Sequence, residues 1–175
     1  MEKTSERLEA MGVKITYGEE VESRSRYMHT REGDRILVGP FMSGAELNKE
    51  LEDSRLTAEL NIDPGEVETA AELPEDHPLY AIRLAALRLI LMSIDFATRE
   101  VKDQDVDNIK RCLSMNVNVA VSPGYINLEV IGIMYGNLLA MIFGPGIRPI
   151  VTVTGVVANP RGSLMTISAE YIAAD

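Results

Sequence analysis

The sequence predicts an α+β fold in which a mostly antiparallel sheet packs on one long central helix. The first observation behind this prediction is an apolar run over residues 79–97, where 15 of 19 residues are apolar and neither glycine nor proline occurs. Pro78 precedes the run at a position that favours the start of a helix. The second observation is that apolar and polar residues alternate from residue 116 onward, in short segments separated by turns, which is typical of β-strands.

The long helix is expected over residues 78–102, and because it is apolar on nearly every side it must be surrounded by protein. Successive helical residues are turned by about 100°, so Arg88, Asp95 and Arg99 share one narrow stripe. We expect this stripe to be the face of the helix that contacts water. Charged residues also interrupt the apolar run, so the helix is not expected to span a membrane.

The segment after the long helix is expected to form a second helix over residues 104–115, on which Cys112 is a buried and inert thiol. The rest of the chain is expected to form a five-strand antiparallel meander over residues 116–173, because short turns join the strands. The predicted strands cover residues 116–121, 126–134, 138–143, 150–158 and 163–173.

The N-terminal portion, residues 1–77, is acidic and less regular. With 175 residues the chain can bury a substantial core, and we expect one α+β domain over residues 1–175. The elements expected in the N-terminal portion are a helix at 4–11, strands at 13–17, 35–38 and 56–62, a helix at 45–53 and a long polar loop at 18–34.

The distribution of charge restricts the partners of this chain. Residues 1–78 hold 19 acidic and 9 basic side chains, a net charge of −10, and the remaining residues hold 8 of each sign. Nucleic acids and anionic membranes bind to basic surfaces, so neither is expected as a partner. The single cysteine excludes an internal disulfide, and the charged N-terminus lacks the apolar segment of a signal peptide, so a cytoplasmic location is expected.

The best candidate for a ligand-binding site is the glycine- and proline-rich turn between the third and fourth strands of the predicted meander. Gly144 and Gly146 leave its backbone accessible to a ligand, and Arg148 offers a planar fork of donors to a carboxylate or phosphate. In a meander the first and third turns lie at the same end of the sheet. We therefore expect Ser122 and Tyr125 to complete a small anion site with Arg148.

Two alternatives to this anion site stay open. In the first, the turn is merely stiff and Arg148 pairs with Glu129 or another carboxylate. In the second, the same pocket belongs to an enzyme of small-molecule metabolism, with His29 or Tyr125 as the candidate proton carrier and the loop at 18–34 as a lid. The two histidines lack the spacing of metal ligands, so no metal site is expected, and the sequence identifies no cofactor.

The function expected from the sequence is therefore that of a cytoplasmic small-molecule-binding protein that recognises an anionic metabolite. A third hypothesis is a structural or regulatory subunit that binds a protein partner through an apolar sheet face. The predicted strands hold more apolar surface than one helix covers, so we expect a homodimer.

Overall fold

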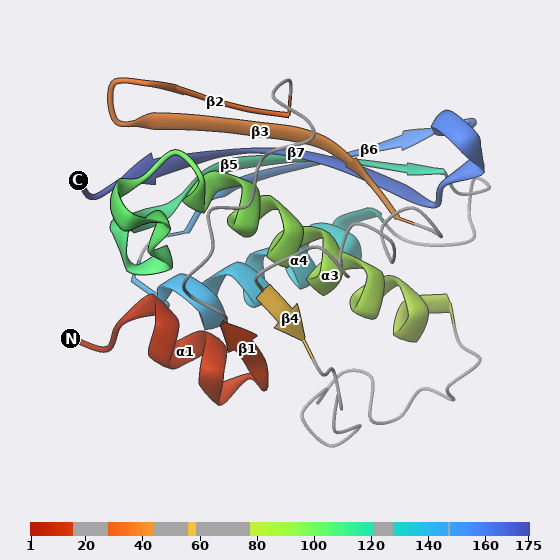
Figure 1. The fold of residues 1–175 in the computed structure, drawn as a ribbon. Helices are drawn as coiled ribbons and strands as arrows, with labels where there is room; N and C mark the ends of the chain where they lie inside the picture. The colour runs from red at the N-terminus through yellow and green to blue at the C-terminus, as the bar shows by residue number, and fades with distance from the viewer. Residues whose placement is uncertain (16–27, 44–55, 59–77, 121–127, 147) are drawn as a thin grey trace.

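The computed structural model describes residues 1–15, 28–43, 56–58, 78–120, 128–146 and 148–175. Figure 1 shows a layered arrangement in which a five-stranded sheet lies on one side and two helices, α3 and α4, lie along one of its faces. A third helix, α1, and a small two-stranded sheet lie on the far side of these two helices.

The main sheet is mixed, and its strand order is β2-β3-β7-β5-β6. The strands β2, β3, β7 and β5 pair antiparallel in that order, whereas the edge strand β6 pairs parallel to β5. The strands of this sheet are β2 (His29–Glu32), β3 (Arg35–Met42), β5 (Ile109–Ala120), β6 (Ile150–Val156) and β7 (Met165–Ala173), and those of the small antiparallel sheet are β1 (Val13–Ile15) and β4 (Leu56–Ala58).

The predicted meander over residues 116–173 is wrong in its middle section, because α4 (Leu128–Phe143) replaces the second and third predicted strands. The buried residues of α4 recur every three or four positions, as on a helix. Gly132 lies inside the predicted strand at 126–134 and Gly136 lies between that strand and the next, positions at which glycine favours a bulge or a turn. Short apolar runs also do not distinguish a strand from a buried helix. The crossover through α4 makes β5 and β6 parallel, so the sheet is mixed: its other three strand pairings are antiparallel, as expected, but the fourth is not.

The predicted second helix over residues 104–115 is also wrong. Two single turns of 3-10 helix, Lys102–Gln104 and Val106–Asn108, lead directly into β5. The pairing of β5 with β7 shifts register at two places before Ser114. These irregularities interrupt the alternation of buried residues, so the start of β5 does not have the period of two that marks a regular strand.

Cys112 lies on β5, not on a helix, and is 2% exposed. Burial raises the pKa of its thiol to about 12. The expected burial of this cysteine is therefore confirmed in a different secondary structure, and the thiol stays protonated at neutral pH.

The long apolar helix is α3 (Pro78–Thr98), four residues shorter than the range expected from the sequence. The prediction that one helix alone fills the sheet is wrong, because α4 covers the same face beside it (Figure 1). The expected water-exposed stripe is wrong as well: Asp95 is 1% exposed and its carboxylate accepts a hydrogen bond from the Arg99 guanidinium at 3.1 Å. Arg99 also lies over the ring of Phe96, 4.0 Å from its centroid, so this charge is buried with an ionic and an aromatic partner.

The N-terminal elements agree in part with the prediction. The helix expected at 4–11 is confirmed as α1 (Thr4–Ala10), and the strand expected at 35–38 continues to Met42 in β3. The end of the expected loop at 18–34 is not a loop, because β2 pairs with β3 there. The helix expected at 45–53 and most of the strand expected at 56–62 lie outside the described residues.

The sheet face turned away from the helices is mostly polar. The exposed positions of β5 and β6 on this face include Asn116, Asn118, Thr152 and Thr154, together with Ile150 at the start of β6, and they alternate with apolar residues that face the helices. The helices thus cover most of the apolar sheet surface, although Leu37 and Ile150 are exposed on the open face, and the hypothesis of a partner-binding sheet face stays a prediction. Among the described residues, no helix is long and apolar enough to cross a membrane.

Candidate functional site: a hollow between helix α4 and edge strand β6

A hollow of about 530 Å³ lies between α4 and β6. One wall consists of α4 and the other of the β6 residues Val151 and Val153, and the turn that carries Arg148 closes one end. The hollow therefore lies at the edge of the sheet, on its helix-covered side.

Small residues on α4 open this hollow. Gly132, Gly136 and Ala140 line it, and their spacing of four residues places them on one side of the helix. A side chain added at Gly136 would meet no atom within 4 Å, so the missing side chain leaves open space. In contrast, a side chain added at Gly155 would meet Leu128 at 3.2 Å, so this glycine lets the start of α4 lie close to the end of β6.

The charged residues of the hollow lie at its opposite ends. Glu129 is in the first turn of α4, next to Leu128, which packs beside Gly155 near the end of β6. Arg148 is exposed and precedes the start of β6. The length of β6 separates the two ends by roughly 20 Å at about 3.3 Å per residue. An ion pair between Arg148 and Glu129 within one chain, the alternative raised from the sequence, does not fit this separation.

The structure separates Gly144 from Arg148, two of the residues expected at the anion site. Arg148 lines the hollow, and Gly146 is exposed in the same turn. Gly144 is buried instead and ends α4 in the left-handed conformation, with a φ of +98° that favours glycine. A side chain there would meet the Arg7 guanidinium at 3.3 Å, so Gly144 faces α1 and not the hollow.

The other two residues expected at this site, Ser122 and Tyr125, lie outside the described residues. Their predicted position rested on the meander, in which the first and third turns share one end of the sheet. Because α4 replaces two of the predicted strands, that argument no longer places them beside Arg148.

His29, the other candidate proton carrier, lies far from the hollow. It is on β2, the opposite edge strand of the sheet, and its Nδ1 atom is 2.6 Å from Oε1 of Glu100. Four strand spacings of about 4.8 Å separate β2 from β6, a distance of roughly 19 Å. His29 therefore does not reach a ligand in the hollow.

Sequence reasoning missed the contribution of α4 to the site. Tyr135 is buried, its hydroxyl is 3.5 Å from Sδ of Met165, and burial raises its pKa, so this phenol stays protonated in the core. Asn137, by contrast, lines the hollow and offers an amide. The signal in the sequence was the repeat of small residues at 132, 136 and 140, which is meaningful only on a helix.

This chain resembles known proteins in its three-dimensional structure, but no sequence comparison finds a relative. No protein-family model matches the chain, and no curated protein matches it. A protein of unknown function from Agrobacterium tumefaciens superposes with a TM-score of 0.62 at 17% identity, over 97% of this chain and 92% of that one. A candidate endoribonuclease from Shewanella oneidensis superposes with a TM-score of 0.65 at 14% identity, over 98% and 99%.

A third solved structure, a candidate translation initiation inhibitor from Rhodopseudomonas palustris, gives a TM-score of 0.50 at 17% identity, over 93% of this chain and 99% of that one. The fold is a known one. At these identities the comparisons establish the α+β fold with its five-stranded mixed sheet and leave the function to the residues of this chain.

Proposed function

We propose that this protein binds a small anionic molecule, a carboxylate or a phosphate, in the hollow between α4 and β6. The observation that carries the proposal is the position of Arg148, an exposed guanidinium at the end of a 530 Å³ hollow. Its planar fork of donors suits the two oxygens of a carboxylate or phosphate. The glycines of α4 and the valines of β6 leave room for the rest of the ligand.

The electrostatics of the hollow favour an anion at the Arg148 end. Glu129 lies at the other end, roughly 20 Å away along β6, which is beyond the screening length of about 8 Å at physiological ionic strength. The repulsion between Glu129 and an anion held by Arg148 is therefore weak. Asn137, between these ends on α4, adds an amide that can donate to or accept from the ligand.

A small ligand fits this chain better than a nucleic acid. The Shewanella oneidensis protein of similar fold is a candidate endoribonuclease. However, the net charge of −10 opposes binding of a polyanion, and the hollow holds one arginine rather than a basic track. A cytoplasmic location, which the single cysteine suggests, belongs to the same proposal.

The experiment that tests this proposal is a thermal-shift screen against phosphorylated and carboxylated metabolites, followed by calorimetric titration of each hit. The Arg148→Ala variant should lose binding by about tenfold to a hundredfold, because the charge-assisted hydrogen bonds are removed. Its melting temperature should stay close to that of the wild type, because the side chain is exposed.

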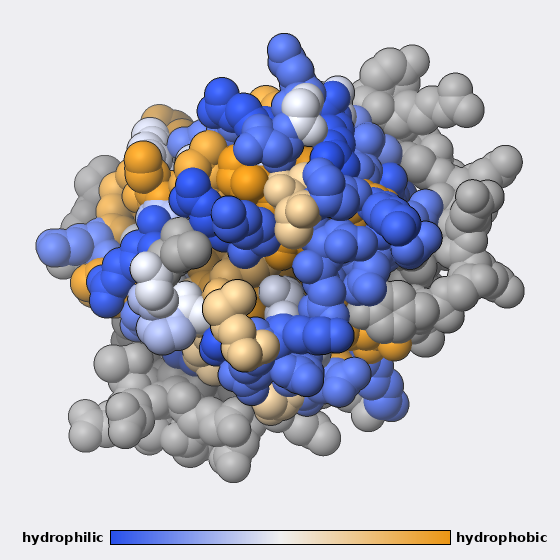
Figure 2. All heavy atoms as spheres, turned by 90° about the vertical axis from the view of Figure 1, so that its left-hand side faces the viewer, coloured by the Kyte–Doolittle hydropathy of each residue, from blue (hydrophilic) through white to orange (hydrophobic). Residues whose placement is uncertain are grey.

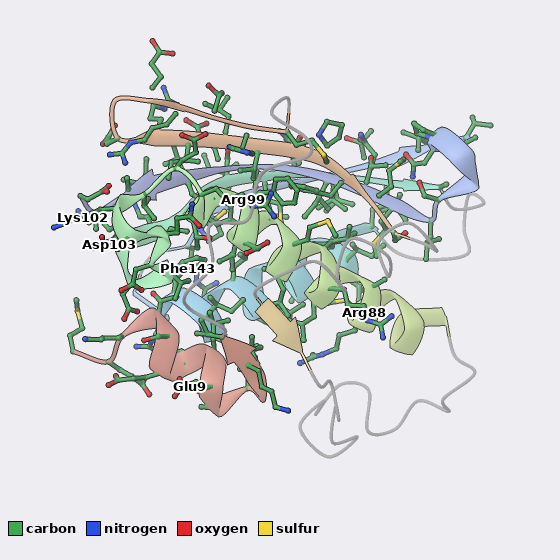
Figure 3. The ribbon with its side chains drawn as sticks, viewed as in Figure 1. Glu9, Arg88, Arg99, Lys102, Asp103 and Phe143 are labelled. Atoms are coloured by element: carbon green, nitrogen blue, oxygen red, sulfur yellow. The ribbon has the colours of Figure 1, made fainter. Side chains whose placement is uncertain are left out.

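The matched control is Lys102→Ala, which removes an exposed cation near the C-terminus of the chain (Figure 3). This variant should bind each hit as the wild type does. Unchanged affinity in the Arg148→Ala variant would refute the site, and so would an equal loss of affinity in the control.

A further inference from the structure

The hollow between α4 and β6 changes in depth along its length. A side chain added at Gly132 would meet Val153 of β6 at 3.5 Å, so the two elements lie in contact there. A side chain added at Gly136, four residues later on α4, would meet no atom within 4 Å. The hollow is therefore shallow at Gly132 and deep at Gly136.

Two contacts between α4 and β6 show how the two elements run past each other. Leu128 lies against Gly155, and Gly132 lies against Val153. From the first contact to the second, α4 advances by four residues, about 6 Å, and β6 goes back by two, about 6.6 Å. The helix and the strand are therefore antiparallel and keep the same step.

The deep part of the hollow lies toward the Arg148 end. Repeating the same step places Gly136 beside Val151, which is about 10 Å from Arg148 along the chain. The contact of Gly132 with Val153 lies about 6.6 Å farther along β6. A ligand held by Arg148 thus has room for a tail that fills the deep part, and a longer tail meets the contact beyond it.

The lining of the deep part suits an apolar tail. Gly136 and Ala140 of α4 lie on one side, and Val151 of β6 lies on the other. Ile133 also lines the hollow and is 57% exposed, so a tail that covers it removes apolar surface from water. The face shown in Figure 2, by contrast, carries mainly hydrophilic side chains, with hydrophobic ones gathered between them.

The Arg148 end suits a carboxylate better than a phosphate. Pro145 and Pro149 line the hollow on either side of Arg148 in the sequence, and neither has an N–H group to donate. Helix α4 ends at Phe143, so the negative end of its dipole is the one nearest this turn and disfavours a second negative charge. One guanidinium pairs with both oxygens of a carboxylate, whereas a phosphate carries up to two charges.

The Arg148 end also disfavours a ligand with a positive charge beside its carboxylate. Among the described residues that line the hollow, the one acidic side chain is Glu129, roughly 20 Å away at the other end. An ammonium group near Arg148 would have no carboxylate of the hollow as a partner and would be repelled by the guanidinium.

We infer that the ligand of the hollow is a monocarboxylate with an apolar tail and no positive charge, and that the contact of Gly132 with Val153 limits the length of this tail. The inference rests on the proposed function, because the carboxylate occupies the anion site at Arg148. It narrows that function to one class of ligand and makes Val153 a specificity-determining residue.

The test is calorimetric titration of the full chain with butanoate, hexanoate, octanoate and decanoate. The dissociation constant should fall about tenfold from butanoate to hexanoate, because two more methylene groups are buried in the deep part. From octanoate to decanoate it should fall less than about twofold, because the added groups lie beyond the contact of Gly132 with Val153 and stay in water. A steady fall through decanoate, or no gain from butanoate to hexanoate, would overturn the inference.

Two further probes test the head group with a tail of similar length. Norleucine adds an ammonium group beside the carboxylate, and hexyl phosphate replaces the carboxylate by a phosphate. Each should bind at least about tenfold more weakly than hexanoate, because an unpaired charge is placed at the Arg148 end. Equal or tighter binding of either probe that is lost in Arg148→Ala would overturn the inference and leave the proposed function intact. If no anion binds, both are refuted.

The Val153→Ala variant should move the limit toward longer tails. Without the contact at Gly132, the dissociation constant of decanoate should fall about fivefold or more relative to that of hexanoate. This ratio is measured within one variant, so a smaller folded fraction does not change it. If the variant does not fold, the wild-type titrations still decide the question.

The matched control is Val130→Ala, the same change on α4 at a residue that is 39% exposed and is not among the described residues lining the hollow. Its ratio of decanoate to hexanoate affinity should equal that of the wild type. An unchanged ratio in Val153→Ala, or the same shift in the control, would show that Val153 does not limit the tail.

Discussion

The two edges of the five-stranded sheet are built differently. The β2 edge carries His29, Arg31 and Glu32 in four residues, whereas the β6 edge carries no charge in seven. The side chains of β2 are also held in place, since His29 contacts Glu100 and Arg31 donates to Asp175. The comparison indicates that charged and paired side chains protect the β2 edge, whereas β6 has no charged residue and borders the hollow.

Arg31 connects the β2 edge to two other segments through the hydrogen bonds that it donates, and we call this set of contacts the β2 clamp. Its guanidinium donates to the carbonyl oxygens of Gly33 and Glu100 and to the carboxylate of Asp175, and its side chain is 23% exposed. It therefore joins the hairpin, the end of α3 and the end of β7. These three segments lie far apart in sequence and side by side in space.

The largest effect is expected from Arg31→Ala, which removes these hydrogen bonds and leaves the Glu100 carbonyl and Asp175 carboxylate without them. The free energy of unfolding should fall by about 2 kcal/mol, as for a partly buried charged hydrogen-bond network. Urea denaturation monitored by circular dichroism measures this change.

The control for this prediction is Arg35→Ala in the same hairpin. Arg35 pairs with Glu170, but its side chain is 57% exposed, so water screens the pair and the cost should be at most about 0.5 kcal/mol. If both variants lose the same stability, the clamp is an ordinary surface feature and the contrast between the two edges disappears.

A medium effect is expected at the β6 edge from Gly136→Leu. Space is open at Gly136, and replacing a helical glycine should raise the free energy of unfolding by about 0.5–1 kcal/mol. The new side chain should also fill the hollow and abolish ligand binding. The two readouts are thermal unfolding and calorimetric titration with a hit from the metabolite screen.

The matched control for Gly136→Leu is Gly132→Ala. A side chain there would meet Val153 at an ordinary contact distance of 3.5 Å, so binding should fall only slightly. A Gly136→Leu variant that binds as the wild type does would show that the ligand lies elsewhere.

The smallest effect is expected from pH. The pKa of Asp175 is lowered from its ordinary value of 3.8, first by the hydrogen bond from the Lys102 backbone N–H at 2.6 Å and then by Arg31. A carboxylate whose pKa is lower in the folded state stabilises the fold above the unfolded pKa, and this contribution is lost as pH falls through the folded value. The Asp175 contribution should therefore be complete at neutral pH and disappear in acid.

The variant that isolates this contribution is Asp175→Asn. Its stability should lie below that of the wild type at neutral pH, and the difference should shrink below the ordinary value of 3.8. Denaturation curves from about pH 3 to about pH 7 measure it. A difference that stays constant over this range would mean that ionisation of Asp175 does not contribute to the β2 clamp.

Some features of this protein follow from the sequence alone, because the patterns that carry them are local. The helix α1 ends next to Gly12, and α3 is mainly apolar over more than five turns, with no glycine or proline after its first residue, Pro78. The general class of α+β and the burial of Cys112 also came from composition and hydrophobic pattern. Turn chemistry selected Arg148 as an anion-binding candidate, which stays a prediction, and the structure places this residue at the hollow.

Other features were decided only by the tertiary structure. The segment at 128–143 is apolar enough to be a strand or a helix, and its packing against the sheet selects the helix. The bulges near Cys112 that disguise the start of β5 exist because β7 pairs with it. The pair of Asp95 and Arg99 is buried because the surrounding core encloses it and Arg99 lies over Phe96, which no helical pattern encodes.

The hollow shows this division most clearly. The sequence determined that Arg148 sits in a glycine- and proline-rich turn, a local property of six residues. The wall facing it consists of small residues that line up only when α4 forms and crosses over to place β6 parallel to β5. A binding site made by two elements depends on their relative placement, and that placement is set by long-range packing rather than by either sequence segment.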